Sequence, residues 1–297
     1  MKKVTFIGWA MVLGLAVMVK TAFAASPLVD VAWVKEHSCD SNVRVLQTSF
    51  VLSKADYLTG HIPCAVYTNY GKDGWRETLD DVRGMLPSAD KLETLIGSLG
   101  IDNDTHVVLY ASGDSASDLG TSTRVYWTFV TMSHDNVSVL NGGWKAYAAD
   151  ENNPVEKGEN TVAAKTFNAT FRPELRATKD QTAAASTSGG VLVNNLSDTS
   201  YLFRGTIPTS KSIPSTWFTS TGGVYRPVGE LEKIFAHVGV PTTGEQIFFC
   251  GSGHLATVGW FASYALMGNS EASMFDGSMT MWKQDTSLPV ETKVSLK

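Results

Sequence analysis

The chain has 297 residues, a net charge of −5, and 43% hydrophobic against 18% charged residues. This balance is typical of a globular protein, and the length suffices for two domains of ordinary size. The negative charge and the absence of any lysine or arginine run in the central part of the chain argue against nucleic acid or an anionic membrane surface as the main partner.

The chain begins with a pattern typical of a secretory signal peptide. Lys2 and Lys3 precede an apolar run over residues 4–19, and Ala22-Phe23-Ala24 offers small residues for cleavage before Ala25. The run is short for a membrane span. We therefore expect residues 1–24 to be removed, and the mature protein to be exported to a bacterial periplasm without a membrane segment.

Two stretches of the chain show the same order of predicted elements. Each has an early buried strand, a helix, a central strand, a second helix and a last strand, with a Gly/Ser-rich loop between the central strand and the second helix. In the first copy the strands and helices are expected at residues 43–46, 88–99, 106–110, 123–132 and 137–140. In the second copy they are expected at 191–193, 228–238, 246–250, 257–267 and 272–275. This order indicates an internal duplication. The predicted fold class is α/β, with two tandem domains that each have a mainly parallel sheet flanked by helices. We place these domains at residues 25–151 and 183–297, joined by a polar linker at 152–182.

There are three cysteines, Cys39, Cys64 and Cys250. A Cys39–Cys64 disulfide is one possibility, which the sequence cannot establish because bridging needs a specific distance between the two residues. Cys250 is then the unpaired thiol.

Cys250 stands where a predicted central strand ends, and the loop Cys250-Gly251-Ser252-Gly253-His254-Leu255 leads into a predicted helix. Such a loop can curl around the sulfur and direct backbone N–H groups at it, which favours a negatively charged sulfur. Glycines allow the backbone to approach closely and to adopt φ values that other residues avoid. The end of a strand in an α/β sheet is also where ligands are expected. We therefore interpret Cys250 as a nucleophile, rather than as a buried structural cysteine.

Several motifs, in order along nearly the whole mature chain, resemble the two-domain rhodanese family of thiosulfate and 3-mercaptopyruvate sulfurtransferases. They are Gly60-His61-Ile62-Pro63, Met85-Leu86-Pro87-Ser88-Ala89, Gly142-Gly143-Trp144-Lys145-Ala146, Cys250-Gly251-Ser252-Gly253 and Asp276-Gly277-Ser278. The resemblance implies that Cys250 takes a sulfur atom from a small anionic donor as a persulfide and passes it to a thiol, sulfite or cyanide-like acceptor. In the first copy Ala111 stands in place of the nucleophile, which implies a catalytically silent domain.

The resemblance also implies roles for residues around Cys250, and each role has a structural alternative. Ser252 would hydrogen-bond the donor or only shape the loop. His254 would stabilise the thiolate when charged, contact the donor, or merely start the helix. Arg204 would clamp the donor anion or form a surface ion pair. His61 would face the cleft or brace a turn.

The loop departs from the family pattern at His254-Leu255, where the mercaptopyruvate-type loop has Val-Thr, so substrate choice stays open. A phosphatase of this fold would need an arginine after Cys-x5, and the chain has Ala256 there. A non-catalytic sulfur- or partner-binding module remains the alternative. Neither a metal site nor a cofactor site is predicted, because the histidines do not pair with cysteines or carboxylates at ligand spacings and no nucleotide-binding loop occurs.

Overall fold

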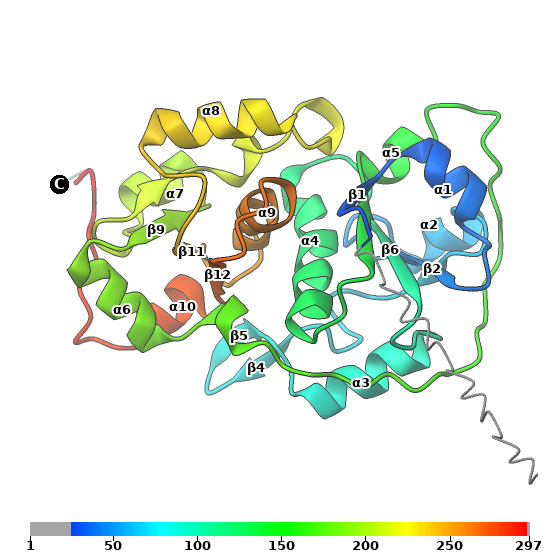
Figure 1. Cartoon of the computed structure of the whole chain (residues 1–297), viewed down its shortest axis with the longest axis horizontal. Helices are drawn as coiled ribbons and strands as arrows, with labels where there is room; N and C mark the ends of the chain where they lie inside the picture. The colour runs from blue at the N-terminus through cyan, green and yellow to red at the C-terminus, as the bar shows by residue number, and fades with distance from the viewer. Residues whose placement is uncertain (1–24, 296–297) are drawn as a thin grey trace, which may run out of the picture.

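The computed structural model describes residues 25–295 and contains two five-stranded sheets whose paired strands are all parallel (Figure 1). The first has the order β1-β7-β6-β2-β3, with strands Leu28–Val29, Val137–Leu140, His106–Tyr110, Val43–Gln47 and Val66–Tyr67. The second has the order β8-β12-β11-β9-β10, with strands Arg176–Ala177, Ala272–Phe275, Gln246–Phe249, Val191–Asn194 and Lys211–Ser212. The two sheets therefore have corresponding strand orders, with β6 and β11 in the middle.

Helices flank both sheets. The first half holds α1 to α5, at Val31–His37, Lys54–Thr59, Ala89–Ser98, Ala116–Thr131 and Gly143–Tyr147. The second half holds α6 to α10, at Lys179–Ser188, Asp198–Phe203, Val228–Val238, Ala256–Phe261 and Ser278–Trp282, and α9 continues as one π-helical turn, Ala262–Leu266. A separate antiparallel hairpin, β4 (Glu77–Leu79) and β5 (Val82–Met85), extends from the first half.

The largest hydrophobic core lies between the two sheets and is shared by both halves. Strand residues alternate between sheet faces, so Leu109 and Phe248 enter this shared core while Tyr110 and Phe249 pack on the opposite faces. Helices α4 and α9 lie side by side at its centre (Figure 1). Their contact includes a 2.8 Å hydrogen bond between the hydroxyls of Thr123 and Thr257. The carboxyl ends of the two central strands are thereby held within one rigid core.

Most predicted elements appear at or near their expected positions, and α8 has the predicted bounds 228–238. Helix α4 is longer than predicted, because it begins at Ala116 rather than near residue 123. Its true start is capped by Ser115, whose hydroxyl accepts a hydrogen bond from the N–H of Asp118.

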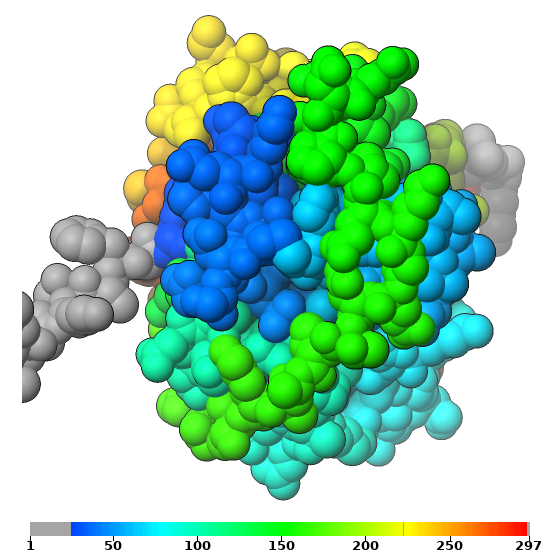
Figure 2. All heavy atoms as spheres, turned by 90° about the vertical axis from the view of Figure 1, so that its right-hand side faces the viewer, coloured from blue at the N-terminus to red at the C-terminus, as the bar shows by residue number. Residues whose placement is uncertain are grey.

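The segment between the halves runs in an extended path over the first half, as Figure 2 shows for the green residues that cross the blue and cyan ones. It is fastened there by backbone hydrogen bonds, including Lys165 N–H to the carbonyl of Gly97 at 2.9 Å. The ordered elements of the second half begin before residue 183, since β8 and the start of α6 fall inside the predicted linker. A two-residue strand carries no readable periodicity, and the Thr178–Gln181 capping box that starts α6 consists of polar residues.

Cys39 and Cys64 form a disulfide, with their Cα atoms 5.2 Å apart. It ties the turn after α1 to the segment after α2. The signal peptide predicted at residues 1–24 lies outside the described residues. Between residues 25 and 295, no helix has both the length and the apolar character needed to cross a membrane.

Candidate active site

Cys250 is buried, at 2% exposure, directly after the central strand β11. The loop that follows is fastened by α10. The N–H groups of Cys250 and Gly253 both donate to the hydroxyl of Ser278, at 3.1 and 3.0 Å, and the N–H of Thr280 donates to the carbonyl of Gly251 at 2.9 Å. One serine hydroxyl thus holds the two sides of the loop together.

Other N–H groups of the loop are left free. Those of Gly251, Ser252, His254 and Leu255 make no hydrogen bond to any residue within 25–295. Consecutive backbone N–H groups without acceptors form the kind of concave site that binds an anion. The loop is therefore suited to hold a negatively charged sulfur or the oxyanion end of a small molecule.

Gly253 is the residue that the loop geometry constrains most. Its φ is +67°, and a Cβ there would lie 2.4 Å from the carbonyl oxygen of Asp276 and 2.8 Å from Nη1 of Arg124. Gly251 differs, since the closest neighbour of a Cβ there is Leu196 at 3.8 Å. Glycine is thus required at position 253 by both backbone conformation and space.

A buried ion pair from both halves supports the loop from behind. Nη1 of Arg124 lies 2.7 Å from Oδ1 of Asp276 and donates to the carbonyl of Gly253 at 2.9 Å. The other oxygen of Asp276 accepts from the N–H of Leu86 at 2.7 Å. Burial lowers the pKa of Arg124, and the charge of Asp276 opposes that effect. The first domain thus takes a direct part in shaping the loop of the second.

His254 is held by the first domain and is neutral. Its Nε2–H donates to the carbonyl of Ser117 at 2.8 Å, so Nδ1 accepts from the hydroxyl of Tyr70 at 2.8 Å. Burial, followed by the charge of Arg76, lowers the pKa of His254 to about 4. The imidazole fits against bare backbone at Gly120, where a Cβ would lie 2.8 Å from Nε2. A charged His254 acting on the thiolate is therefore not supported near neutral pH.

Ser252 is contacted by Arg76, a residue that the sequence did not single out. Nη2 of Arg76 donates to the carbonyl of Ser252 and lies 3.4 Å from its hydroxyl. Leu255 packs, partly buried, against the shared core. All six residues of the predicted loop are thus placed together, and the first domain adds Tyr70, Arg76 and Arg124 to them.

The structure does not join the other two predicted site residues to the loop. His61 is fully buried against Tyr57, with its Nδ1 2.7 Å from the Tyr57 carbonyl and its Nε2 3.2 Å from the amide of Asn160. This is the turn-bracing arrangement. Arg204 is exposed at the end of α7, where its N–H donates to the carbonyl of Ser200 and its own carbonyl accepts from Nζ of Lys283.

The corresponding loop of the first domain is closed by its own carboxylate. Ala111 follows β6 as Cys250 follows β11, and the next N–H, that of Ser112, donates to the buried Asp118 at 2.6 Å. Asp118 also accepts from the hydroxyl of Ser49 and the N–H of Phe50. Asp118 thus takes the N–H of Ser112, which corresponds to the free N–H of Gly251, and Ala111 offers no thiol.

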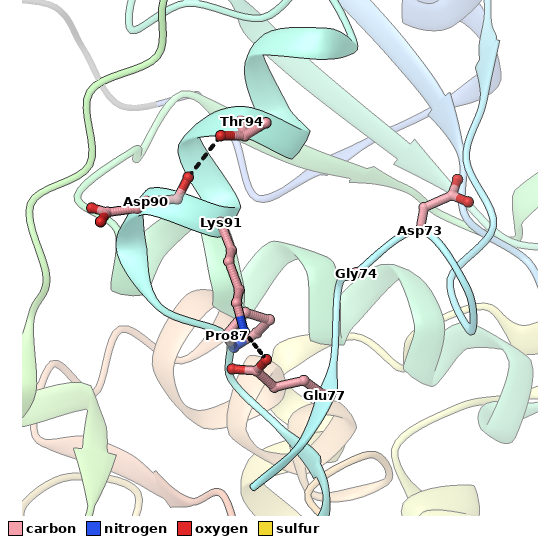
Figure 3. Close-up of a pocket in the computed structure, with 7 residues that line it drawn as sticks. All are labelled: Asp73, Gly74, Glu77, Pro87, Asp90, Lys91 and Thr94. Atoms are coloured by element: carbon pink, nitrogen blue, oxygen red, sulfur yellow. Dashed lines mark hydrogen bonds and ion pairs between the residues drawn. The ribbon is translucent and has the colours of Figure 1, made fainter.

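A surface hollow of about 450 Å³ lies on the first domain (Figure 3). Its lining includes Asp73, Asp90 and the ion pair between Lys91 and Glu77, and none of its residues belongs to the Cys250 loop. Within residues 25–295, no group of three or more His, Cys, Asp or Glu side chains is arranged to hold a metal ion.

Fold and site together define a protein with two rhodanese-like halves and one thiol centre. A Rhodanese-like domain matches residues 30–150. The thiosulfate sulfurtransferase of Rattus norvegicus is 31% identical over 90% of this chain and 95% of its own length. The thiosulfate/3-mercaptopyruvate sulfurtransferase 2 of Arabidopsis thaliana is 26% identical over 89% and 86%.

A crystal structure of SseA from Escherichia coli, described as a 3-mercaptopyruvate sulfotransferase with the rhodanese fold, superimposes with a TM-score of 0.74 at 24% identity, covering 86% of this chain and 99% of that one. The chain belongs to the rhodanese family of sulfurtransferases, and it is an enzyme of that class. The predicted fold is confirmed, and the non-catalytic alternative is not favoured.

Proposed function

We propose that the protein transfers sulfane sulfur from thiosulfate or 3-mercaptopyruvate to a thiophilic acceptor through a persulfide on Cys250. The observation that carries this proposal is the Cys250 loop, whose shape is fixed by Ser278 and Arg124 while four of its N–H groups remain without an acceptor. The curated relatives named above supply the two donor classes.

The reaction consists of two displacements. The Cys250 thiolate attacks the outer sulfur of thiosulfate; a new S–S bond forms at Cys250, the sulfur–sulfonate bond breaks, and its electron pair leaves on sulfite. The acceptor then attacks the outer sulfur of the persulfide and releases the thiolate. The free N–H groups suit both states, because each places negative charge on sulfur in the loop.

Initial-rate kinetics test the proposal. With thiosulfate or 3-mercaptopyruvate varied at several fixed concentrations of cyanide, two successive displacements predict parallel double-reciprocal lines and thiocyanate as product. Cys250→Ser should reduce the rate to the uncatalysed level. Intersecting lines, or a Cys250→Ser variant that keeps its activity, would refute the persulfide route.

We also propose that the mature protein acts in the periplasm of a bacterium. Support comes from the signal-like pattern at residues 1–24 and from the Cys39–Cys64 disulfide, since disulfides persist in oxidising compartments. Expression of the full chain in a bacterium, followed by fractionation and intact-mass measurement, should find a periplasmic species that begins at Ala25. A full-length species in the cytoplasm would contradict this localisation.

A further inference from the structure

A second cavity, of about 280 Å³, is lined by residues of the first domain, two of which contact the Cys250 loop. Its lining includes Tyr70, Arg76, Glu77, Thr78, Arg83 and Gly84. Two of these residues connect it to the active site. Arg76 donates to Ser252, two residues after Cys250, and Tyr70 donates to His254. Burial raises the pKa of Tyr70, and the positive charge of Arg76 opposes that effect.

The guanidinium of Arg76 is held in place without a carboxylate. Its Nε donates to the carbonyl of Gly84 at 3.0 Å, its Nη2 contacts the oxygen atoms of Ser252, and its Cζ lies 5.8 Å from the centre of the Tyr70 ring. Gly84 must be glycine for this arrangement, because its φ is +86° and a Cβ would lie 1.8 Å from Nη2 of Arg76. A positive charge is therefore fixed beside the loop by neutral partners.

Arg83 adds a second charge to the cavity. It is exposed on β5, next to Gly84, and within residues 25–295 no carboxylate lies within ion-pair distance of it or of Arg76. The acidic residue in the cavity wall, Glu77, is neutralised by Lys91 at 2.5 Å, and Figure 3 shows this pair pointing into the neighbouring hollow. The cavity thus has two guanidinium groups whose charges are not compensated.

We propose that Arg76 and Arg83 form an oxyanion subsite that binds the sulfonate end of a thiosulfate-class donor. This inference rests on the proposed sulfur transfer and assigns donor recognition to the first domain, whereas the family resemblance pointed to Arg204 in the second. Guanidinium groups match the oxygen geometry of sulfonate, and Arg76 links the bound anion to the loop that holds Cys250.

The subsite has a defined part in the first displacement. When the Cys250 thiolate takes the outer sulfur, the electron pair of the broken S–S bond leaves on sulfite, whose oxygens are the atoms that Arg76 and Arg83 contact. The two arginines stabilise this departing charge and are themselves unchanged, so no further reactant is needed.

The test compares Arg83→Gln and Arg83→Lys with Lys233→Gln, which removes one positive charge from the exposed surface of α8. Two quantities are measured in the full-length mature protein: the affinity for sulfate, an unreactive oxyanion, by calorimetry, and KM and kcat for thiosulfate with cyanide as acceptor. Loss of a charged hydrogen bond predicts that Arg83→Gln weakens sulfate binding and raises KM about tenfold. Arg83→Lys should recover part of the sulfate affinity and part of the wild-type KM. Lys233→Gln should match the wild type in both quantities.

The two readouts separate the subsite from the reaction. If the wild type takes no sulfur from thiosulfate but binds sulfate in an Arg83-dependent way, the subsite stands and the proposed function fails. If Arg83→Gln behaves like Lys233→Gln in both measurements, the subsite is refuted. A rise in KM for Arg204→Gln without one for Arg83→Gln would also refute it and would place recognition on the second domain.

Discussion

Gly251 and Gly253 flank the same serine, yet the loop depends on them to different degrees. Gly253 has a positive φ and contacts Asp276 and Arg124 too closely for any side chain, while Gly251 faces open space up to Leu196. The motif alone predicted glycines for a tight loop and could not distinguish the two. The distinction arises from residues in distant parts of the chain, including one from the other domain.

Gly253→Ala should therefore destabilise the protein and reduce activity. Strain at a positive φ and the displacement of Asp276 or Arg124 predict a loss of about 1–3 kcal/mol in the free energy of unfolding. The same distortion should lower kcat for sulfur transfer by more than about tenfold. Chemical denaturation and steady-state rates measure both effects. Gly251→Ala is the matched control, and its free energy of unfolding should stay within about 0.5 kcal/mol of wild type. Equal losses for both variants would show that the positive φ of Gly253 is not what requires glycine there.

At the scale of elements, the sequence predicted the helices and strands whose apolar residues repeat regularly. Helix α8 and the central strands were predicted because their apolar residues repeat at helical or buried-strand spacing. The first turns of α4 were missed because Asp118, Thr121 and Ser122 are polar and nevertheless buried. These side chains are polar because they make hydrogen bonds inside the protein. The hydropathy of a single sequence does not distinguish such buried polar residues from exposed ones.

The hairpin β4–β5 was missed for a related reason. It is short, partly exposed and lacks strict alternation, yet it places Arg83 and Gly84 in the same cavity as Arg76, which contacts the Cys250 loop. Site residues contributed by such an element have no signal in the local pattern. One signal was present in α4, where Arg124 interrupts an otherwise apolar or small run and is wholly buried; a buried charge of this kind usually has a partner.

The α4–loop connection predicts strong coupling between Arg124 and Asp276. Asp276→Asn leaves the buried Arg124 without a carboxylate and should lower the free energy of unfolding by about 3–5 kcal/mol. Arg124→Met should cost less, because Asp276 keeps Arg176 at 3.4 Å. The double variant should lose less than the sum of the single losses, by at least about 1 kcal/mol. Urea unfolding of the four proteins in the cycle measures this. Additive losses would mean that the pair does not act as a unit.

At the scale of the whole molecule, the two halves form one working structure, because the loop of one is shaped by side chains of the other. His254 is part of that interface. Its pKa in the folded protein is lowered to about 4 from an ordinary value of 6.5. Between these values the unfolded chain binds more protons, so the contribution of His254 to stability is present above about pH 6.5 and is lost as the pH falls towards 4.

His254→Gln should therefore flatten the pH dependence of stability. Unfolding free energies of wild type and variant, measured from pH 7 to pH 4, should show the steeper fall in the wild type. Half-buried His106 and buried His134, whose pKa values are also lowered, contribute to both proteins and cancel in the comparison. Parallel curves would show that His254 is not held neutral in the interface.

The disulfide belongs to the same scale, since it constrains the first domain far from the chemistry. Cys39 and Cys64 are 25 residues apart in sequence. Loop-closure entropy predicts that the double variant Cys39→Ala/Cys64→Ala loses about 3 kcal/mol of stability. Its kcat at a temperature where it is folded should equal that of wild type. A loss of sulfur transfer in the folded variant would mean that the disulfide takes part in the reaction.

The most direct measurement of the central claim is the isolation of sulfur on Cys250. The mature protein is incubated with thiosulfate labelled in its outer sulfur, digested without reductant, and its peptides are analysed by mass spectrometry. A persulfide on Cys250 requires one labelled sulfur atom on the peptide that contains Cys250, removed by cyanide as labelled thiocyanate, and no label in Cys250→Ser. Label elsewhere in the chain, or label that persists in Cys250→Ser, would contradict it.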